Sequence, residues 1–185
     1  MAELIVGGAR SGKSGLAAQR AAQSGLAVVY LATARAEDPE MARRVAHHRT
    51  HRPLHWTSVE EPLYLAAALR RCAAAGTCVL VDCLTLWLSN LFFAGRAAAQ
   101  AEAGEAIDCP LLADQTGALL DGLPALPGRV ILVSNEVGSG IVPMNALGRI
   151  FADEQGRLNQ RVAAASDRVT LTVAGLPLEL KGPAG

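Results

Sequence analysis

The sequence has no excess of either charge, because its 17 Lys and Arg residues are balanced by 17 Asp and Glu residues. This balance argues against a generic nucleic-acid binder, which needs surplus positive charge to displace counterions from phosphates, and against a polybasic membrane anchor. No apolar run approaches the roughly 20 residues of a membrane-spanning helix. We therefore expect no nucleic-acid partner and no membrane span.

We also expect neither paired cysteines nor a leader sequence. No CxxC spacing occurs among Cys72, Cys78, Cys83 and Cys109, which indicates buried thiols in a reducing cytosol. The first residues, MAELIVGGARSGKS, do not show the basic, apolar and small-residue succession of a signal peptide. We expect a cytoplasmic protein. With 51% hydrophobic and 18% charged residues in 185, the chain can form a core, and its length favours one domain over residues 1–185.

Short runs rich in Val, Ile and Leu alternate with stretches rich in Ala, Leu and Arg. Runs that are apolar on both faces are typical of a parallel sheet covered on both sides, and their alternation with helices indicates the α/β class. The predicted strands are Glu3–Val6, Ala27–Ala32, Thr77–Asp82, Arg129–Ser134 and Arg168–Val173. The predicted helices are Lys13–Ser24, Pro39–His51, Pro62–Ala75, Leu84–Phe93, Leu111–Asp121 and Asn145–Ala165.

Two further stretches are less regular. Around the helix at 111–121, residues 94–127 are rich in Ala, Gly and Pro and carry little pattern, so we expect a peripheral excursion there. The C-terminal sequence LPLELKGPAG is expected to form a short edge strand and a frayed end.

The segment GGARSGKS matches the phosphate-loop pattern G-x-x-x-x-G-K-[ST], and it stands between an apolar strand and an Ala-rich helix. Its glycines let successive backbone N–H groups face a phosphate, and the helix N-terminus adds partial positive charge. Lys13 is expected to be exposed and to reach the β- and γ-phosphates, and Ser14 to bind Mg²⁺. The predicted nucleotide-binding residues of this loop are Gly7, Gly8, Ala9, Arg10, Ser11, Gly12, Lys13 and Ser14.

A second apolar strand, CVLVD, ends in Asp82. In a Walker B arrangement this carboxylate holds Mg²⁺ directly or through water. The alternative is that Asp82 only caps the following helix. Together, the two motifs predict a P-loop NTPase-like (RecA-like) three-layer fold with a mostly parallel sheet and helices on both faces.

All four histidines lie close together in RRVAHHRTHRPLHW, at His47, His48, His51 and His55. A metal site is disfavoured, because Pro53 interrupts the helical spacing and no Cys, Asp or Glu lies among them. Two interpretations stay open. The segment is either a solvated basic helix face or a site for phosphate chemistry, in which arginines clamp phosphate oxygens and a neutral imidazole attacks phosphorus.

The combined motifs resemble one family over most of the chain, the bifunctional adenosylcobinamide kinase and adenosylcobinamide-phosphate guanylyltransferase of adenosylcobalamin biosynthesis. The phosphate loop alone is unspecific. The more specific segments are YLATA, HHRTHRPLHW, VDCLTLWLSNL, VSNEVGSGIVP and GRLNQRVAAASD.

The resemblance implies that ATP or GTP phosphorylates adenosylcobinamide, and that GMP from GTP is then transferred to adenosylcobinamide phosphate through a histidine. It places GMP on His48, with His47 as the runner-up. Some relatives have Glu at the position of Asp82, which preserves metal binding. It also implies a homo-oligomer, a trimer. The further nucleotide contacts that it implies are Leu31, Ala32, Thr33, Arg49, Thr50, His51, Arg52, Glu60 and Asp82.

Two other functions stay open on sequence grounds: a single-activity kinase of another small alcohol, and a non-catalytic nucleotide-dependent assembly module. The sequence does not choose between ATP and GTP for the kinase step. The loop NEVGSGIVP, with Asn135 and Glu136 after a strand, is either a corrinoid contact or a Gly-rich turn, since ligands gather at the carboxyl ends of strands in open α/β sheets.

Overall fold

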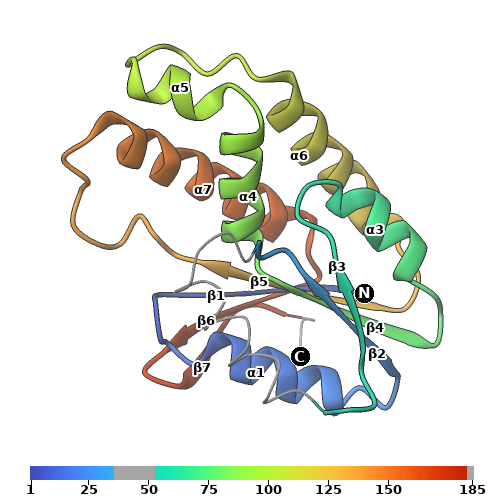
Figure 1. The fold of residues 1–185 in the computed structure, drawn as a ribbon. Coiled ribbons are helices and arrows are strands. Elements are labelled where there is room, and N and C mark those ends of the chain that lie inside the picture. Colours follow the sequence, from blue (N-terminus) through green and yellow to red (C-terminus); the bar gives the residue numbers. More distant parts are fainter. Residues whose placement is uncertain (36–52, 183–185) are drawn as a thin grey trace.

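A seven-stranded sheet forms the middle layer of the computed structural model, which describes residues 1–35 and 53–182 (Figure 1). The strand order is β3-β2-β4-β5-β1-β6-β7, and all pairs are parallel except the antiparallel pair β6–β7. The strands are β1 (Ala2–Gly7), β2 (Ala27–Ala32), β3 (Thr57–Glu60), β4 (Thr77–Asp82), β5 (Arg129–Asn135), β6 (Arg168–Val173) and β7 (Leu176–Lys181). The predicted α/β class with a mostly parallel sheet is confirmed.

Helices cover the sheet unequally. Among the described helices, α1 packs on one face, and the others form a layer on the opposite face (Figure 1). The described helices are α1 (Lys13–Ala22), α3 (Leu65–Cys72), α4 (Leu84–Ala94), α5 (Ala97–Glu102), α6 (Pro110–Gly122), η1 (Leu123–Ala125) and α7 (Ala146–Ala165). The helix predicted at Pro39–His51 lies entirely outside the described residues.

Side chains of each strand alternate between two cores, as the pleat of a strand requires. Leu4 and Leu132 belong to the larger core under the layer of α3 to α7, whereas Ile5, Ile131 and Val133 face α1. All five are buried. This explains why the predicted strands read as continuous apolar runs, since both faces of the sheet are covered.

The expectation of a peripheral excursion at residues 94–127 is wrong. Ala97, Ala98, Leu112, Leu119 and Leu123 from this stretch are nearly inaccessible and belong to the larger core. The short side chains of α5 allow it to approach α4 and α7 closely. Alanine carries little periodic signal, so the sequence pattern understates how much of this stretch is buried.

The two edges of the sheet differ from the rest. The strand β3 was not predicted, because its sequence TSVE is short and largely exposed. The expected edge strand at the C-terminus is β7, whose side chains are exposed along its length.

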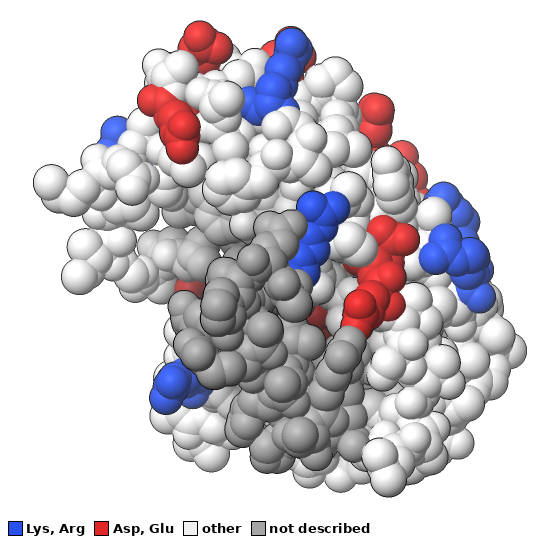
Figure 2. All heavy atoms as spheres, in the orientation of Figure 1, with Lys and Arg blue, Asp and Glu red and all other residues white. Residues whose placement is uncertain are grey.

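On the face in Figure 2, basic and acidic side chains are interspersed outside the grey atoms. Within the described residues, no helix is long and apolar enough to cross a membrane.

An ion cluster ties β1, α1 and the edge hairpin together. Glu3 is fully buried and accepts from Arg20 and, at 2.7 Å, from Arg129. Arg20 also donates to Glu179 at 2.7 Å, and Arg168 donates to the other Glu179 oxygen at 2.6 Å. Burial acts to raise the pKa of Glu179, but hydrogen bonds from Arg168, Arg20 and Thr170 outweigh it and lower the pKa to about 2.

We expect Glu179→Gln to lower the free energy of unfolding by about 1 kcal/mol near neutral pH, since solvent around the 40% exposed side chain screens the interaction. The depressed pKa means that this contribution is complete above the ordinary value of 4.5 and is lost as the pH falls toward 2. Urea denaturation of both proteins at about pH 7 and about pH 3 measures it. The difference should shrink at the lower pH; a constant difference would contradict the ionic role of the carboxylate.

Candidate nucleotide and phosphoryl-transfer site

The predicted phosphate loop lies between the carboxyl end of β1 and the N-terminus of α1, as the motif requires. At Gly7 a Cβ atom would lie 2.5 Å from both Ser11 Oγ and the Thr172 carbonyl oxygen, so only glycine fits the close curl. Gly12 has φ +94°, which also favours glycine. The turn between β6 and β7 supports the loop from outside, because Gly175 N–H donates to the Ser11 carbonyl at 2.9 Å.

The expectation that Lys13 is exposed is wrong, since the residue is only 9% exposed. Its Nζ donates to the Gly8 carbonyl oxygen at 2.9 Å, so the ammonium lies within the loop itself. Burial lowers the pKa of Lys13, and the nearby charge of Asp82 offsets part of this effect. A flexible lysine stem can shift this ammonium from a carbonyl to a phosphate oxygen with a small movement.

Asp82 lies at the end of β4 and accepts from the Tyr30 hydroxyl at 2.7 Å. Asp82 does not cap the following helix, because Cys83 is the N-cap of α4 and no side chain caps that helix. Burial, together with the negative charge of Asp82, raises the pKa of the Cys83 thiol to about 11, so the thiol stays protonated at neutral pH. The carboxylate of Asp82 and the ammonium of Lys13 therefore supply the negative and the positive charge of this site.

Of the residues predicted after the second strand, Thr33 has a clear structural role. Its Oγ1 donates to the Cys83 carbonyl at 2.7 Å and accepts from Cys83 N–H at 2.9 Å, which ties the carboxyl ends of β2 and β4 together. Leu31 is fully buried in the larger core, on the face away from α1. Ala32 is also buried, and Glu60 ends the neighbouring strand opposite Ala32 in the register.

Ser14 and Asp82 are the residues of this site that would hold Mg²⁺. Ser14 stands in the first turn of α1 and is partly exposed, and none of the hydrogen bonds within residues 1–35 and 53–182 engages its hydroxyl. Asp82 lies close enough to raise the pKa of Lys13 through its charge. Hydroxyl and carboxylate oxygens are the ligands that Mg²⁺ prefers.

Polar residues that the sequence analysis did not select lie beneath the end of β5. Gln155 and Asn159 of α7 are buried one helical turn apart. The Ser134 hydroxyl donates to Asn159 Oδ1 at 2.6 Å and accepts from Gln155 Nε2 at 3.0 Å. A polar residue in an apolar strand, with two amides spaced i and i+4 on a helix, is the sequence signal that could have identified this network.

Most of the predicted histidine segment lies outside the described residues, namely His47, His48, Arg49, Thr50, His51 and Arg52. His55 is described and exposed, and the following Trp56 is buried in the smaller core against the α1 side of the sheet. This anchors the C-terminal end of the segment near β3. The structure therefore brings together the phosphate loop and Asp82, and leaves the histidine assignments as predictions.

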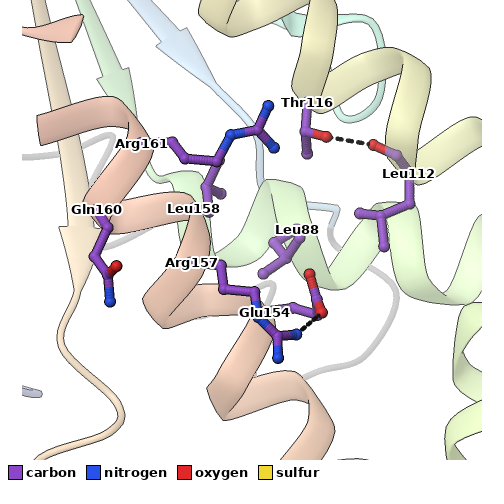
Figure 3. A pocket seen from close by; sticks show the side chains of 8 residues that line it. All are labelled: Leu88, Leu112, Thr116, Glu154, Arg157, Leu158, Gln160 and Arg161. Atoms are coloured by element: carbon purple, nitrogen blue, oxygen red, sulfur yellow. Dashed lines mark hydrogen bonds and ion pairs between the residues drawn. The ribbon is translucent and has the colours of Figure 1, made fainter. Parts of the chain in front are cut away.

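A separate cavity of about 220 Å³ lies within the layer of helices on the other face of the sheet (Figure 3). Leu88, Leu112 and Leu158 form its apolar part, and Arg157 and Arg161 of α7 lie beside it. Arg157 pairs with Glu154 of the same helix. Because α1 and its loop lie on the opposite face, this cavity is not the nucleotide site.

Comparison with known proteins identifies the family to which this chain is similar. A family model described as cobinamide kinase / cobinamide phosphate guanyltransferase matches residues 3–180. The bifunctional adenosylcobalamin biosynthesis protein CobP of Pseudomonas aeruginosa is 56% identical over 182 residues, which is 98% of each chain. The protein CobU of Salmonella typhimurium, with the same description, is 39% identical over 184 residues, which is 96% of this chain and 98% of the relative.

A solved structure confirms the fold class. An ATPase from the type III secretion system of pathogenic bacteria superposes with a TM-score of 0.53 at 14% identity. The match covers 96% of this chain and 56% of the ATPase. At this identity the likeness shows the fold alone, and that fold is the P-loop, RecA-like one that the strand order and the phosphate loop predict.

Proposed function

Because the chain belongs to the cobinamide kinase / cobinamide phosphate guanyltransferase family, a family of transferases, we propose that it catalyses two successive reactions on adenosylcobinamide. In the first, the hydroxyl of the aminopropanol arm attacks the γ-phosphorus of ATP or GTP, its proton is lost, and a nucleoside diphosphate leaves. In the second, GMP from GTP joins the new phosphate, giving adenosyl-GDP-cobinamide and pyrophosphate. The observation that carries the proposal is a complete phosphate loop facing Asp82 in a chain that matches the family over residues 3–180.

The kinase reaction needs positioning and charge neutralisation more than covalent chemistry. The backbone N–H groups of Gly8 to Ser14 and the N-terminus of α1 hold the phosphates in this proposal, and Lys13 neutralises charge on the transferred group. Ser14 and Asp82 would hold Mg²⁺, which would supply further neutralisation of the phosphate charge. Glu60, Ala32, Leu31 and Thr33 complete the proposed nucleotide contacts. The side chains of Leu31 and Thr33 are fully buried, so these two residues contribute only through their backbone.

For the guanylyl reaction we assign the covalent role to His48, following the family resemblance. A neutral imidazole nitrogen attacks the α-phosphorus of GTP, the bond to the β-phosphate oxygen breaks, and pyrophosphate leaves. A phosphate oxygen of adenosylcobinamide phosphate then displaces the histidine, so the second step forms the new P–O–P bond and releases the imidazole. Arg49 and Arg52 clamp phosphate oxygens in this proposal, and Thr50 and His51 contact the nucleotide.

A charge-removing substitution tests the proposed metal role of Asp82. Asp82→Asn keeps the shape and the acceptor for the Tyr30 hydroxyl, so the fold should persist. We expect kinase activity to fall by about 100-fold and the Mg²⁺ concentration for half-maximal rate to rise. A magnesium titration of the rate measures both, with Asp114→Asn on the exposed side of α6 as the matched control. An unchanged magnesium dependence would remove Asp82 from metal binding.

We further propose a cytoplasmic homo-oligomer. The four cysteines are free, which suits a reducing compartment. Ile141, Val142 and Met144 are more than 70% exposed in the segment after β5, and contiguous exposed apolar side chains suit contact with a second copy of the chain. The trimeric state rests on the family resemblance.

Two labelled nucleotides test the proposed function. With adenosylcobinamide and γ-labelled ATP, the label should move to the corrinoid. With α-labelled GTP alone, the protein should retain an acid-labile, base-stable label, as expected of a phosphoramidate. Corrinoid labelling without protein labelling would indicate a single-activity kinase, and nucleotide binding without either transfer would indicate an assembly module.

A further inference from the structure

Asn135, at the end of β5, occupies a central position at the carboxyl edge of the sheet. β5 lies between β1, which leads into the phosphate loop, and β4, which ends in Asp82. In the register, Asn135 pairs with Gly7, and Val133 pairs with Asp82. The residue therefore stands between the first glycine of the phosphate loop and the strand of the proposed metal ligand.

The alternation along β5 places the Asn135 side chain on the α1 side of the sheet. Val133 packs in the core against α1, whereas Ser134 contacts Gln155 and Asn159 of α7 on the opposite side. Because side chains of a strand alternate, Asn135 follows Val133 to the α1 side. By the same alternation Asp82 follows Leu80 to that side, and the hydroxyl of Tyr30, a residue of the same core, contacts it there. Lys13 of α1 lies on this side as well.

The backbone around Asn135 is held by three different elements. Its N–H donates to Thr85 Oγ1 of α4 at 2.9 Å, and its carbonyl accepts from Asn159 Nδ2 of α7 at 3.0 Å. The next N–H, that of Glu136, donates to the Gly7 carbonyl at 3.0 Å. A buried, multiply bonded polar network of this kind fixes one geometry. The position of Asn135 is thereby tied to both the phosphate loop and the helix that follows Asp82.

The side chain of Asn135 contrasts with this fixed backbone. It is only partly buried, and no hydrogen bond within the described parts of the chain engages its amide. A rigidly placed amide with unused donors suits a site where negative charge develops during reaction, since a preorganised donor needs no reorganisation there. A carboxylate at the same place would instead repel a phosphate.

From this arrangement, which rests on the proposed kinase function, we infer that the Asn135 side-chain amide donates a hydrogen bond to the terminal phosphate of a nucleoside triphosphate bound in the phosphate loop. Asn135 is then a recognition residue for the third phosphate rather than a corrinoid contact. A nucleoside diphosphate lacks the third phosphate, so the Asn135 amide adds nothing to its binding affinity.

Equilibrium binding separates these roles without relying on catalysis. The Mg²⁺ complexes of a non-hydrolysable ATP analogue and of ADP are titrated against the wild-type protein, Asn135→Ala and Asn135→Asp. We expect Asn135→Ala to weaken triphosphate binding by about 10-fold or more and to leave diphosphate binding unchanged. Asn135→Asp, which is isosteric but anionic, should weaken triphosphate binding further. Gln160→Ala, which removes an exposed amide of α7 on the other face, is the matched control.

Several results would overturn the inference. Equal loss of both ligands in Asn135→Ala would indicate a structural role, and unchanged affinity for both would remove the contact. An increase only in the KM for adenosylcobinamide would assign Asn135 to the corrinoid. If the wild-type protein bound neither nucleotide, the proposed function would fail and the inference with it, whereas a variant-specific failure would leave the proposed function standing.

Discussion

In the Lys13→Ala variant, transfer of phosphate to adenosylcobinamide is expected to fall by on the order of 1,000-fold. Lys13 is the cation inside the phosphate loop, and its ammonium bonds the Gly8 carbonyl at 2.9 Å. Without it, charge that develops on the transferred phosphoryl group loses its nearest protein counter-charge. A steady-state assay with γ-labelled ATP measures the loss, and an unchanged rate would remove the loop lysine from the mechanism.

Because Lys13 is buried rather than exposed, truncation to alanine also removes packing, so stability must be measured alongside activity. Lys13→Met keeps most of the volume and should lose activity to the same extent while melting close to the wild-type temperature. Lys181→Ala is the matched lysine control. Its ammonium bonds the Ala163 and Ala164 carbonyls at the end of α7, far along the chain from the loop, so kinase activity should persist.

The His48→Ala variant is expected to lose guanylyl transfer to below about 0.1% of the wild-type rate and to keep its kinase activity. The two reactions use different nucleophiles, since phosphoryl transfer depends on Lys13 and Mg²⁺ whereas the proposed GMP carrier is the imidazole. On the predicted helix the neighbouring His47 points about 100° away, so only one of the pair can face the phosphates. His47→Ala should therefore weaken transfer less.

Parallel assays of pyrophosphate release and corrinoid phosphorylation on both variants decide the assignment. His55→Ala, an exposed histidine of the same segment, is the control and should retain both activities. If His47→Ala loses guanylyl transfer and His48→Ala keeps it, the covalent residue is the first of the pair. If both variants transfer GMP normally, the histidine mechanism is wrong.

The apolar strands and the phosphate loop could be predicted because a short physical pattern determines each. The run ELIV followed by GGARSGKS requires a buried strand, a tight turn and a helix in that order. β3 and the burial of α5 were missed because a polar four-residue edge strand and an alanine-rich helix carry little periodic signal. In both cases neighbouring elements, rather than local sequence, determine the structure.

The chemistry of individual residues was harder to predict than their location. The motif places Lys13 at the loop, but its burial and the nearby charge of Asp82, from a strand distant in the sequence, depend on the folded chain. The roles of Gln155 and Asn159 depend on which face of α7 meets the end of β5. These residues can be read from the sequence, but the packing of α7 against the end of β5, which connects them by hydrogen bonds, is a property of the folded chain.

Mass spectrometry of the protein after incubation with GTP and Mg²⁺ tests the central claim, that GMP is carried on a histidine of this chain. We expect the mass to increase by one GMP group as pyrophosphate is released, and the modified peptide to place the group on His48. Addition of adenosylcobinamide phosphate should then return the protein to its original mass. An unmodified protein that still forms adenosyl-GDP-cobinamide, or an adduct on a residue other than histidine, would contradict the account.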